Sequence, residues 1–242
     1  MCGRFSLYFF PDAEREFEER FGIPFPTFDY PASYNISPGT NIPTVKSDEN
    51  DNNQVKEMFW GLIAPFSAEF KPHPKYKMSN TRVESFDKKK ADFRKKLLSI
   101  SRCVVPANNY FEWARIGTGK VPFKVELKHF QLMSFGGIYS VWLNKKGEKF
   151  YSCSIITVPA NRLLEKIHPR MPFILDRTTE RMWLDNAVTD YEVLRDAIRQ
   201  IPDEGLQCFP VSRKVNSTKN NSPDLVVPLT VLHQGGQDDL FR

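Results

Sequence analysis

The chain has 242 residues, of which 40% are hydrophobic and 26% are charged, as in globular proteins that bury a sizeable core. Its four cysteines lie far apart without a Cys-x-x-Cys pair or a histidine cluster, so neither a disulfide framework nor a zinc site is indicated. No run approaches 18 apolar residues, which argues against a membrane span. We expect one domain over residues 1–242, with reduced thiols and no metal, in the cytoplasm.

The net charge of +5 is mildly basic and concentrated in one stretch. Between Lys71 and Lys96 the sequence has ten Lys or Arg residues and only three acidic ones. This distribution indicates a surface that could meet a polyanion, although a solvated basic helix face would give the same pattern.

The first half of the chain predicts few regular elements. Residues 11–22 have the spacing of a short amphipathic helix that ends at a glycine. Residues 21–45 are rich in proline and read as irregular, and the polar segment 46–54 reads as the turn of a hairpin that leads into a strand over 55–63. Residues 71–85 read as a loop. A helix is expected over 86–100, with Phe86, Phe93, Leu97 and Ile100 facing inward.

The second half predicts mostly strands. They are expected over 102–107, 109–115, 121–127, 130–143 and 149–158. Two helices follow, over 178–185 and 189–201, then a last strand over 206–211 and an irregular tail from about 229. So many neighbouring strands indicate an antiparallel or mixed sheet, curled toward a barrel, with peripheral helices. The predicted fold class is α+β.

Three polar residues stand among apolar neighbours, where burial is costly unless the group is paired or used. Glu112 lies between Phe111 and Trp113, and a salt bridge at a sheet edge would also explain it. His168 precedes a proline-rich loop and could move protons near neutral pH. Asn80 follows a loop, where an Asx turn is the alternative. Each of the three residues alone is compatible with a structural role.

Cys2 follows the initiator methionine directly in the opening "MCGRFSLYFF". A small residue at position 2 is compatible with removal of Met1, after which Cys2 would carry a free amine and a thiol on adjacent carbons. The alternative is a small buried residue at the start of a strand.

These four residues lie in four of seven short motifs that follow one another along the chain. The motifs are "MCGRF" at 1–5, "YNISP" at 34–38, "WGLI" at 60–63, "NTRVES" at 80–85, "RCVVPANNYFEW" at 102–113, "HPRMPFIL" at 168–175 and "VSRKVNS" at 211–217. In these motifs the chain resembles the SOS response-associated peptidase (SRAP) family. The resemblance implies a mixed fold with a basic groove and the mature amino terminus at its floor.

The resemblance also implies the working residues. Cys2 would be the nucleophile, Asn80 would orient its amine, Glu112 would act as general acid or base, and His168 would be a second proton-handling group. The expected DNA-binding residues are Arg4, Asn35, Pro38, Trp60, Gly61 and Arg82. The partner implied is single-stranded DNA that contains abasic sites. We expect a monomer without a cofactor, on the nucleoid when DNA is bound.

The chemistry implied by the family is a covalent link to the abasic site. The Cys2 amine would condense with the aldehyde of the opened sugar, and the thiol would close a five-membered thiazolidine. Met1 would be removed by self-cleavage, to which the word peptidase in the family name refers, or by a housekeeping aminopeptidase. Two other hypotheses are a cysteine peptidase that acts in trans and a noncatalytic single-strand binder.

The chain departs from the family pattern at two places. Asn108 and Asn109 stand where Asp-Gly is usual, and asparagine can still supply a turn with left-handed backbone. Pro169 stands where Asp or Asn commonly follows the histidine, and it removes a backbone donor beside His168.

Overall fold

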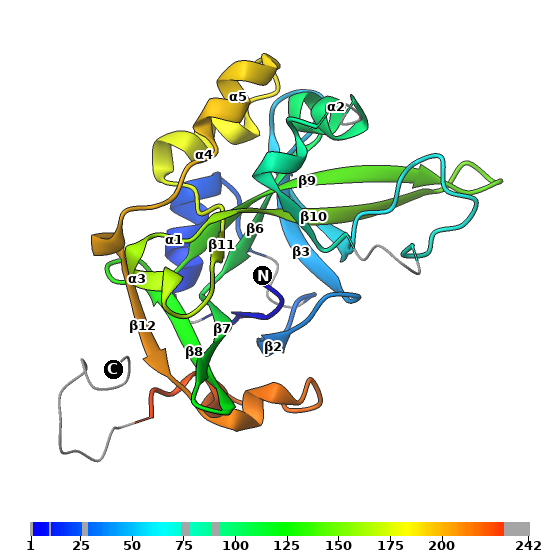
Figure 1. The fold of residues 1–242 in the computed structure, drawn as a ribbon. Helices are drawn as coiled ribbons and strands as arrows, with labels where there is room; N and C mark the ends of the chain where they lie inside the picture. Colours follow the sequence, from blue (N-terminus) through cyan, green and yellow to red (C-terminus); the bar gives the residue numbers. More distant parts are fainter. Residues whose placement is uncertain (1, 10, 26–28, 74–77, 89–91, 230–242) are drawn as a thin grey trace.

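The computed structural model describes residues 2–9, 11–25, 29–73, 78–88 and 92–229. Two sheets make up most of this region, and the helices lie at the periphery, mainly against the larger sheet (Figure 1). The prediction of a strand-rich α+β fold is confirmed. The tail predicted from about 229 lies outside the described residues except for its first residue.

The larger sheet closes on itself. Its ring consists of five strands, β3 (Asn41–Ser47), β4 (Asn53–Trp60), β6 (Arg102–Ala107), β9 (Met133–Leu143) and β10 (Lys149–Pro159). They pair in the order β10, β4, β3, β6 and β9, and β9 pairs with β10 again, which gives the barrel predicted from the sequence. Two short strands, β5 (Asn80–Arg82) and β11 (Arg170–Pro172), extend this sheet along β10.

The second sheet has five strands in the order β12, β8, β7, β1 and β2. Their bounds are β1 (Phe5–Leu7), β2 (Ser33–Ile36), β7 (Asn109–Ile116), β8 (Gly119–Leu127) and β12 (Leu206–Pro210). Every pair in this sheet is antiparallel. Strand β1 of this sheet also contacts β6 of the barrel, so the first described residues of the chain lie where the two sheets meet.

The helices are α1 (Pro11–Phe21), α2 (Asp92–Ile100), α3 (Arg162–Glu165), α4 (Arg177–Leu184) and α5 (Tyr191–Ala197). Helix α1 joins α4 through a buried ion pair in which Arg20 donates to both carboxylate oxygens of Glu180. Arg102 on β6 donates to the carbonyl oxygens of Leu98 and Trp183 at the ends of α2 and α4. These contacts attach the helices to the barrel.

Some local predictions were wrong. The stretch 21–45 was expected to be irregular, yet it contains β2 and the start of β3. The segment 71–85 was expected to be a loop, yet β5 forms there because residues 80–82 pair in parallel with β10, a contact between distant parts of the chain. In α2 the inward residues include Leu98 rather than Ile100, which is 54% exposed. Helix α5 ends at Ala197, before the predicted residue 201.

Candidate functional site

Cys2 lies just before β1, the strand that joins β7 to β2. Phe5 of β1 pairs with Tyr110 on one side and with Ile36 on the other, and the carbonyl oxygen of Arg4 accepts from the Phe111 N–H over 2.9 Å. These contacts fix the first residues of the chain against two strands. The Cys2 side chain is fully buried.

Asn80 approaches Cys2 from the barrel. It lies at the start of β5, opposite Ile155 of β10, and its side-chain Nδ2 donates to the carbonyl oxygen of Cys2 over 2.8 Å. Its other side-chain atom, Oδ1, is buried and accepts no hydrogen bond within the described part of the chain. The structure therefore brings Asn80 and Cys2 into direct contact, and the role of Asn80 in orienting the Cys2 amine stays a prediction.

Glu112 and His168 form the other half of the site. Glu112 lies on β7, is 5% exposed, and has its Oε1 atom 3.9 Å from Nδ1 of His168. Burial raises the pKa of the Glu112 carboxyl, and the positive amino terminus and His168 offset part of this effect. A carboxyl group with a raised pKa beside an imidazole is suited to proton transfer near neutral pH.

The Cys2 thiol is protonated in this environment. Burial raises its pKa well above the ordinary range of a cysteine, and the nearby Glu112 carboxylate raises it further. Burial likewise raises the pKa of Tyr110, whose phenol also feels Cys2 and Glu112. The sulfur is thus a buried neutral thiol, and it would need a base to accept its proton during any attack.

His168 is held by residues on both sides of it in the sequence. Its backbone N–H donates to Leu164 at the end of α3, and Nδ1 accepts from the Arg170 N–H over 3.1 Å. Pro169, the departure from the family pattern, does not prevent this arrangement because the donor comes from Arg170. The His168 side chain remains 27% exposed, so the site is open on its side.

Arg4 and Asn35, both predicted to bind DNA, make internal contacts. Arg4 Nη1 donates to Asn35 Oδ1 over 2.6 Å and to the carbonyl oxygen of Val215 over 2.7 Å. Asn35 is 6% exposed, and its Nδ2 donates to the carbonyl oxygens of Val215, Ser217 and Asn220. These two residues hold the segment 215–220 beside the start of the chain, and their role in DNA binding stays a prediction.

The other predicted DNA-binding residues differ in exposure. Pro38 and Arg82 are exposed. Gly61 is buried, and its N–H donates to Cys153. Trp60 is fully buried, so its ring cannot stack on a base in this conformation. It packs edge-on against Phe5 and donates from Nε1 to the carbonyl oxygen of Ser79, next to Asn80.

Asn108 and Asn109 do not adopt the left-handed backbone suggested from the sequence. In the described ranges the only residue other than glycine with a positive φ is Asp51, in the turn between β3 and β4. Asn108 instead acts through its side chain, because Oδ1 accepts from the Tyr8 N–H and Nδ2 donates to the Gln131 carbonyl oxygen. The loop before Glu112 is therefore fixed by side-chain hydrogen bonds.

The basic stretch from Lys71 to Lys96 is only partly described, since residues 74–77 and 89–91 lie outside the described ranges. Lys71 pairs with Glu69 on the surface. On α2, the Lys95 ammonium lies 4.7 Å from the centre of the Tyr191 ring. Arg82 belongs to the same short strand as Asn80, two residues after it, and its side chain is exposed.

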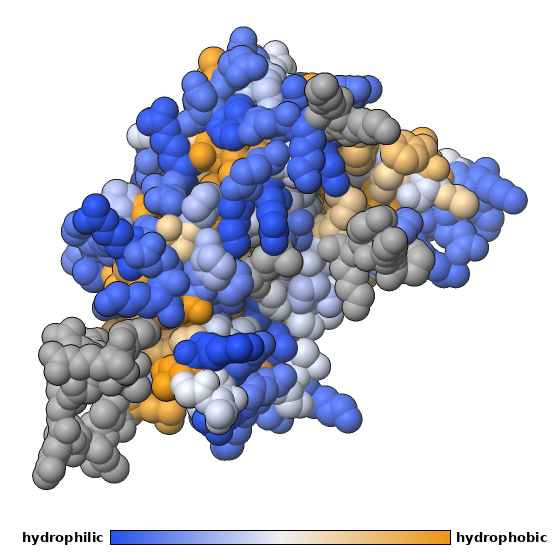
Figure 2. All heavy atoms as spheres, in the orientation of Figure 1, coloured by the Kyte–Doolittle hydropathy of each residue, from blue (hydrophilic) through white to orange (hydrophobic). Residues whose placement is uncertain are grey.

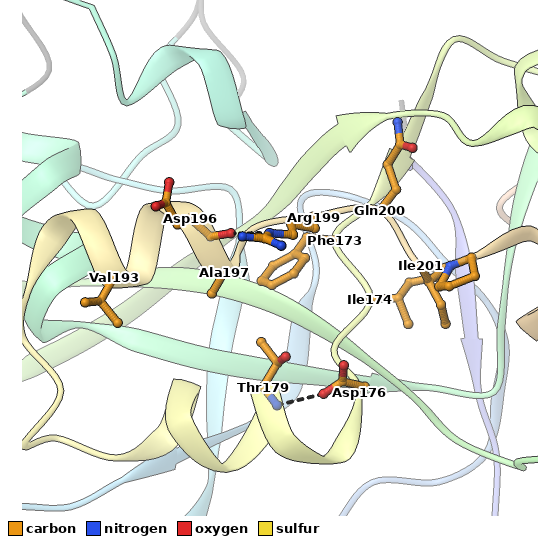
Figure 3. Close-up of a pocket in the computed structure, with 11 residues that line it drawn as sticks. Phe173, Ile174, Asp176, Thr179, Val193, Asp196, Ala197, Arg199, Gln200 and Ile201 are labelled. Carbon is orange, nitrogen blue, oxygen red and sulfur yellow. Dashed lines mark hydrogen bonds between the residues drawn. The ribbon is translucent and has the colours of Figure 1, made fainter.

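Two surface features lie apart from Cys2. A pocket of about 570 Å³ lies between α4 and α5, where Thr179 points toward Ala197 (Figure 3). Apolar residues gather where the ends of β9 and β10 meet the loop after β4 (Figure 2), and Phe66 and Leu143 are exposed there. Neither feature contains one of the four predicted catalytic residues.

The described residues include no group of three or more His, Cys, Asp or Glu side chains that could hold a metal ion. Within the same residues, no helix is long and apolar enough to cross a membrane.

Comparison with known proteins identifies the family to which the chain belongs. The model of the SOS response associated peptidase (SRAP) family matches residues 1–218. The chain belongs to the SRAP family. The match includes the segments that carry Cys2, Asn80, Glu112 and His168.

Curated SRAP relatives cover almost the whole chain. The chain is 39% identical over 232 residues to the abasic site processing protein YoqW of Bacillus subtilis, and the alignment covers 93% of this chain and 99% of YoqW. It is 28% identical over 274 residues to the abasic site processing protein HMCES of Xenopus tropicalis, covering 98% and 81% of the two chains. A crystal structure of a protein from Bacteroides thetaiotaomicron shares the fold, with a TM-score of 0.77 at 24% identity over 95% of this chain and 100% of that one.

Two contacts beside the site were not anticipated from the sequence. Arg170 donates to Glu84 through both Nη atoms, over 2.6 and 3.1 Å, and Trp60 contacts the Ser79 carbonyl oxygen from within the core. Arg170 and Glu84 lie within the motifs "HPRMPFIL" and "NTRVES", so an arginine two residues after His168 and a glutamate four residues after Asn80 were the available signal.

Proposed function

We propose that this SRAP protein captures abasic sites in single-stranded DNA by forming a covalent bond through Cys2. The observation that carries the proposal is the contact in which Asn80 donates to the carbonyl oxygen of Cys2. Burial raises the pKa of the Cys2 thiol, and the Glu112 carboxylate raises it further, which agrees with a Glu112 side chain close to Cys2. The names of the relatives, abasic site processing proteins, support the same substrate.

The reaction begins once Met1 is removed and the Cys2 amine is free. An α-amine with an ordinary pKa of about 7.7 to 8.0 is partly neutral at cellular pH, whereas a lysine near 10.4 is mostly protonated. The amine nitrogen attacks the aldehyde carbon of the opened deoxyribose and forms a carbinolamine. Loss of water then gives an imine.

The thiol completes the ring. Its sulfur adds to the imine carbon, and the thiol proton is transferred to the imine nitrogen, so that one water is lost over the whole reaction. Because the thiol is neutral in this environment, Glu112 serves as the base that takes its proton. In the preceding step the protonated Glu112 donates to the departing hydroxyl, and His168 exchanges protons with Glu112.

Asn80 orients the reacting residue. Its hydrogen bond to the Cys2 carbonyl oxygen fixes the backbone beside the amine, and its buried Oδ1 is an acceptor that the free amine could satisfy. Removal of Met1 precedes this chemistry and proceeds either by attack of Cys2 with help from Glu112 or by a separate aminopeptidase.

DNA binding relies on phosphate contacts. Arg82 is exposed beside Asn80, and Arg4 has an Nη2 group that donates to no partner in the described structure. Arginine is well suited to phosphate oxygens because its donors are fixed in a planar fork. Because the lesion lacks a base, we expect little sequence preference.

A denaturing gel tests this function. Purified protein with a verified free Cys2 amine is incubated with a single-stranded oligonucleotide that carries one abasic site. We expect a heat-stable band of lower mobility, which is absent in Cys2→Ala and retained in Cys208→Ala, a matched change of a thiol on β12. A protein with free Cys2 that gives no band would contradict the proposal, and turnover of an added peptide would support a peptidase acting in trans.

A further inference from the structure

A bidentate ion pair connects the segment that carries Asn80 to the segment that carries His168. Arg170, at the start of β11, donates from Nη1 and Nη2 to the two carboxylate oxygens of Glu84 over 2.6 and 3.1 Å. Glu84 lies in the short 3-10 turn Val83–Ser85, directly after the strand that carries Asn80. One side-chain contact therefore joins the Asn80 segment to the segment that carries His168.

Arg170 is tied down at a third point and touches the His168 ring through its backbone. Its Nη2 also donates to the carbonyl oxygen of Thr157 on β10. Its backbone N–H lies 3.1 Å from His168 Nδ1, and its carbonyl oxygen lies 3.0 Å from the same atom. The N–H can donate to a bare Nδ1, and the carbonyl can accept from Nδ1 when the ring is protonated.

We propose that the Glu84–Arg170 ion pair is a positioning device for His168. It holds the Arg170 backbone in place, and that backbone keeps Nδ1 beside Glu112 in both protonation states of the ring. The inference rests on the proposed function, in which His168 exchanges protons with Glu112. Glu84 and Arg170 are positioning residues here, because they act through His168.

The surroundings of the pair favour this role over a contribution to stability alone. The Glu84 side chain is 52% exposed, and an ion pair with such exposure adds little to folding stability. A double hydrogen bond between planar groups, however, fixes direction as well as distance. Burial alone would raise the pKa of the Glu84 carboxyl, but the hydrogen bond from Arg170, a backbone hydrogen bond and the charges of Arg170 and Arg82 together hold it below its ordinary value, so the carboxylate stays charged at neutral pH.

The chain offers a matched control. On the surface between α2 and α5, Arg195 donates from Nε and Nη2 to the two carboxylate oxygens of Asp87 over 3.0 and 2.7 Å. The Asp87 side chain is 50% exposed, close to the value for Glu84. Asp87→Asn thus removes a charge from a similar pair that has no contact with His168.

The first measurement needs no DNA. Ring nitrogen shifts of His168 are recorded by NMR in wild type, Glu84→Gln and Asp87→Asn, with the exposed His129 as internal reference. We expect the His168 shifts to move toward those of His129 in Glu84→Gln and to stay at the wild-type values in Asp87→Asn. Unchanged His168 shifts in a folded Glu84→Gln protein would overturn the inference.

The second measurement follows capture of an abasic oligonucleotide in a single turnover. We expect Glu84→Gln to lower the rate at saturating DNA by about tenfold, a part of the 100-fold or more that a positioned proton-transfer group supplies, while half-saturation changes little. An unchanged rate would contradict the inference even if the ring shifts moved. If wild type itself fails to capture DNA, the proposed function fails, and the NMR result still decides whether Glu84 positions His168.

Discussion

The side-chain amide of Asn80 donates to the carbonyl oxygen of Cys2 over 2.8 Å, while Asn80 Oδ1 is buried without a partner in the described structure. An unsatisfied buried acceptor is costly, and such groups are uncommon in native structures. The amide is therefore set up to accept a donor near Cys2, and the amine that Cys2 gains when Met1 is removed is the group that our proposal supplies.

The first prediction concerns this contact. Asn80→Asp keeps the shape of the side chain but replaces the donor by a carboxylate oxygen facing the Cys2 carbonyl. We expect capture of an abasic oligonucleotide to slow by at least about tenfold, because a small displacement of a reacting group is expensive in rate. Single-turnover gels measure the effect. Asn186→Asp is the control, since Asn186 also donates to a backbone carbonyl but lies on the surface.

The second prediction concerns Glu112 and stability. Burial raises its pKa in the folded protein, so the folded state holds the proton more tightly than the unfolded chain. Stability from this group is therefore fully present below the unfolded pKa of about 4.3 and falls as the pH rises through the folded pKa. We expect Glu112→Gln to melt about 2 to 4 °C above wild type at pH 7, which corresponds to about 1 kcal/mol.

Well below the unfolded pKa the two proteins should melt together, because Glu112 is then protonated in both the folded and the unfolded state. Thermal unfolding followed by circular dichroism at several pH values tests this. If Glu112→Gln and wild type differ in melting temperature by the same amount at all pH values, burial does not raise the pKa of Glu112. The same variant should capture abasic DNA slowly, since glutamine cannot exchange a proton.

The third prediction concerns the ion pair that joins α1 to α4. Arg20 and Glu180 are both buried, with 3% of each side chain exposed. Arg20→Ala leaves the Glu180 carboxylate buried without its cation, and we expect a loss of about 3 to 5 kcal/mol in the free energy of unfolding. Arg15→Ala removes a partner of the exposed Asp12 and should cost at most about 1 kcal/mol. Urea denaturation distinguishes the two, and equal losses would contradict the assignment.

The fourth prediction concerns Asn35. Its amide holds three carbonyl oxygens of the segment 215–220, and its Oδ1 accepts from Arg4. We expect Asn35→Ala to increase backbone hydrogen exchange in that segment while exchange in the barrel strands stays unchanged. If exchange in 215–220 is unaltered, Asn35 does not restrain the segment.

Much of the fold could be predicted because its signals are local. The strands over 102–107 and 149–158 and the helix over 11–22 follow from alternation and from the spacing of apolar residues, and the structure has β6, β10 and α1 in these places. The polar turn 46–54 joins β3 to β4 as expected, with Asp51 at its positive φ.

What the sequence did not show depends on distant contacts. β5 is a strand only because it lies beside β10, and three residues after a proline-rich loop carry no pattern of their own. The assignment of Arg4 and Asn35 to DNA binding was made from motifs alone. Their hydrogen bonds to the Val215 carbonyl oxygen form only when the first residues of the chain fold against the segment 215–220. Similarly, a tryptophan in a "WGLI" motif can be exposed or buried, and the barrel buries Trp60.

The central claim is most directly tested by the mass of the captured product. After incubation with an abasic oligonucleotide, nuclease and protease digestion should yield an amino-terminal peptide that begins at Cys2 and carries the sugar remnant. The mass of this product should equal the mass of the free peptide plus that of the sugar remnant, less one water. The Cys2 sulfur in this product should not be alkylated by iodoacetamide. A remnant located on a lysine, a Cys2 thiol that still alkylates, or an adduct that retains Met1 would contradict the account.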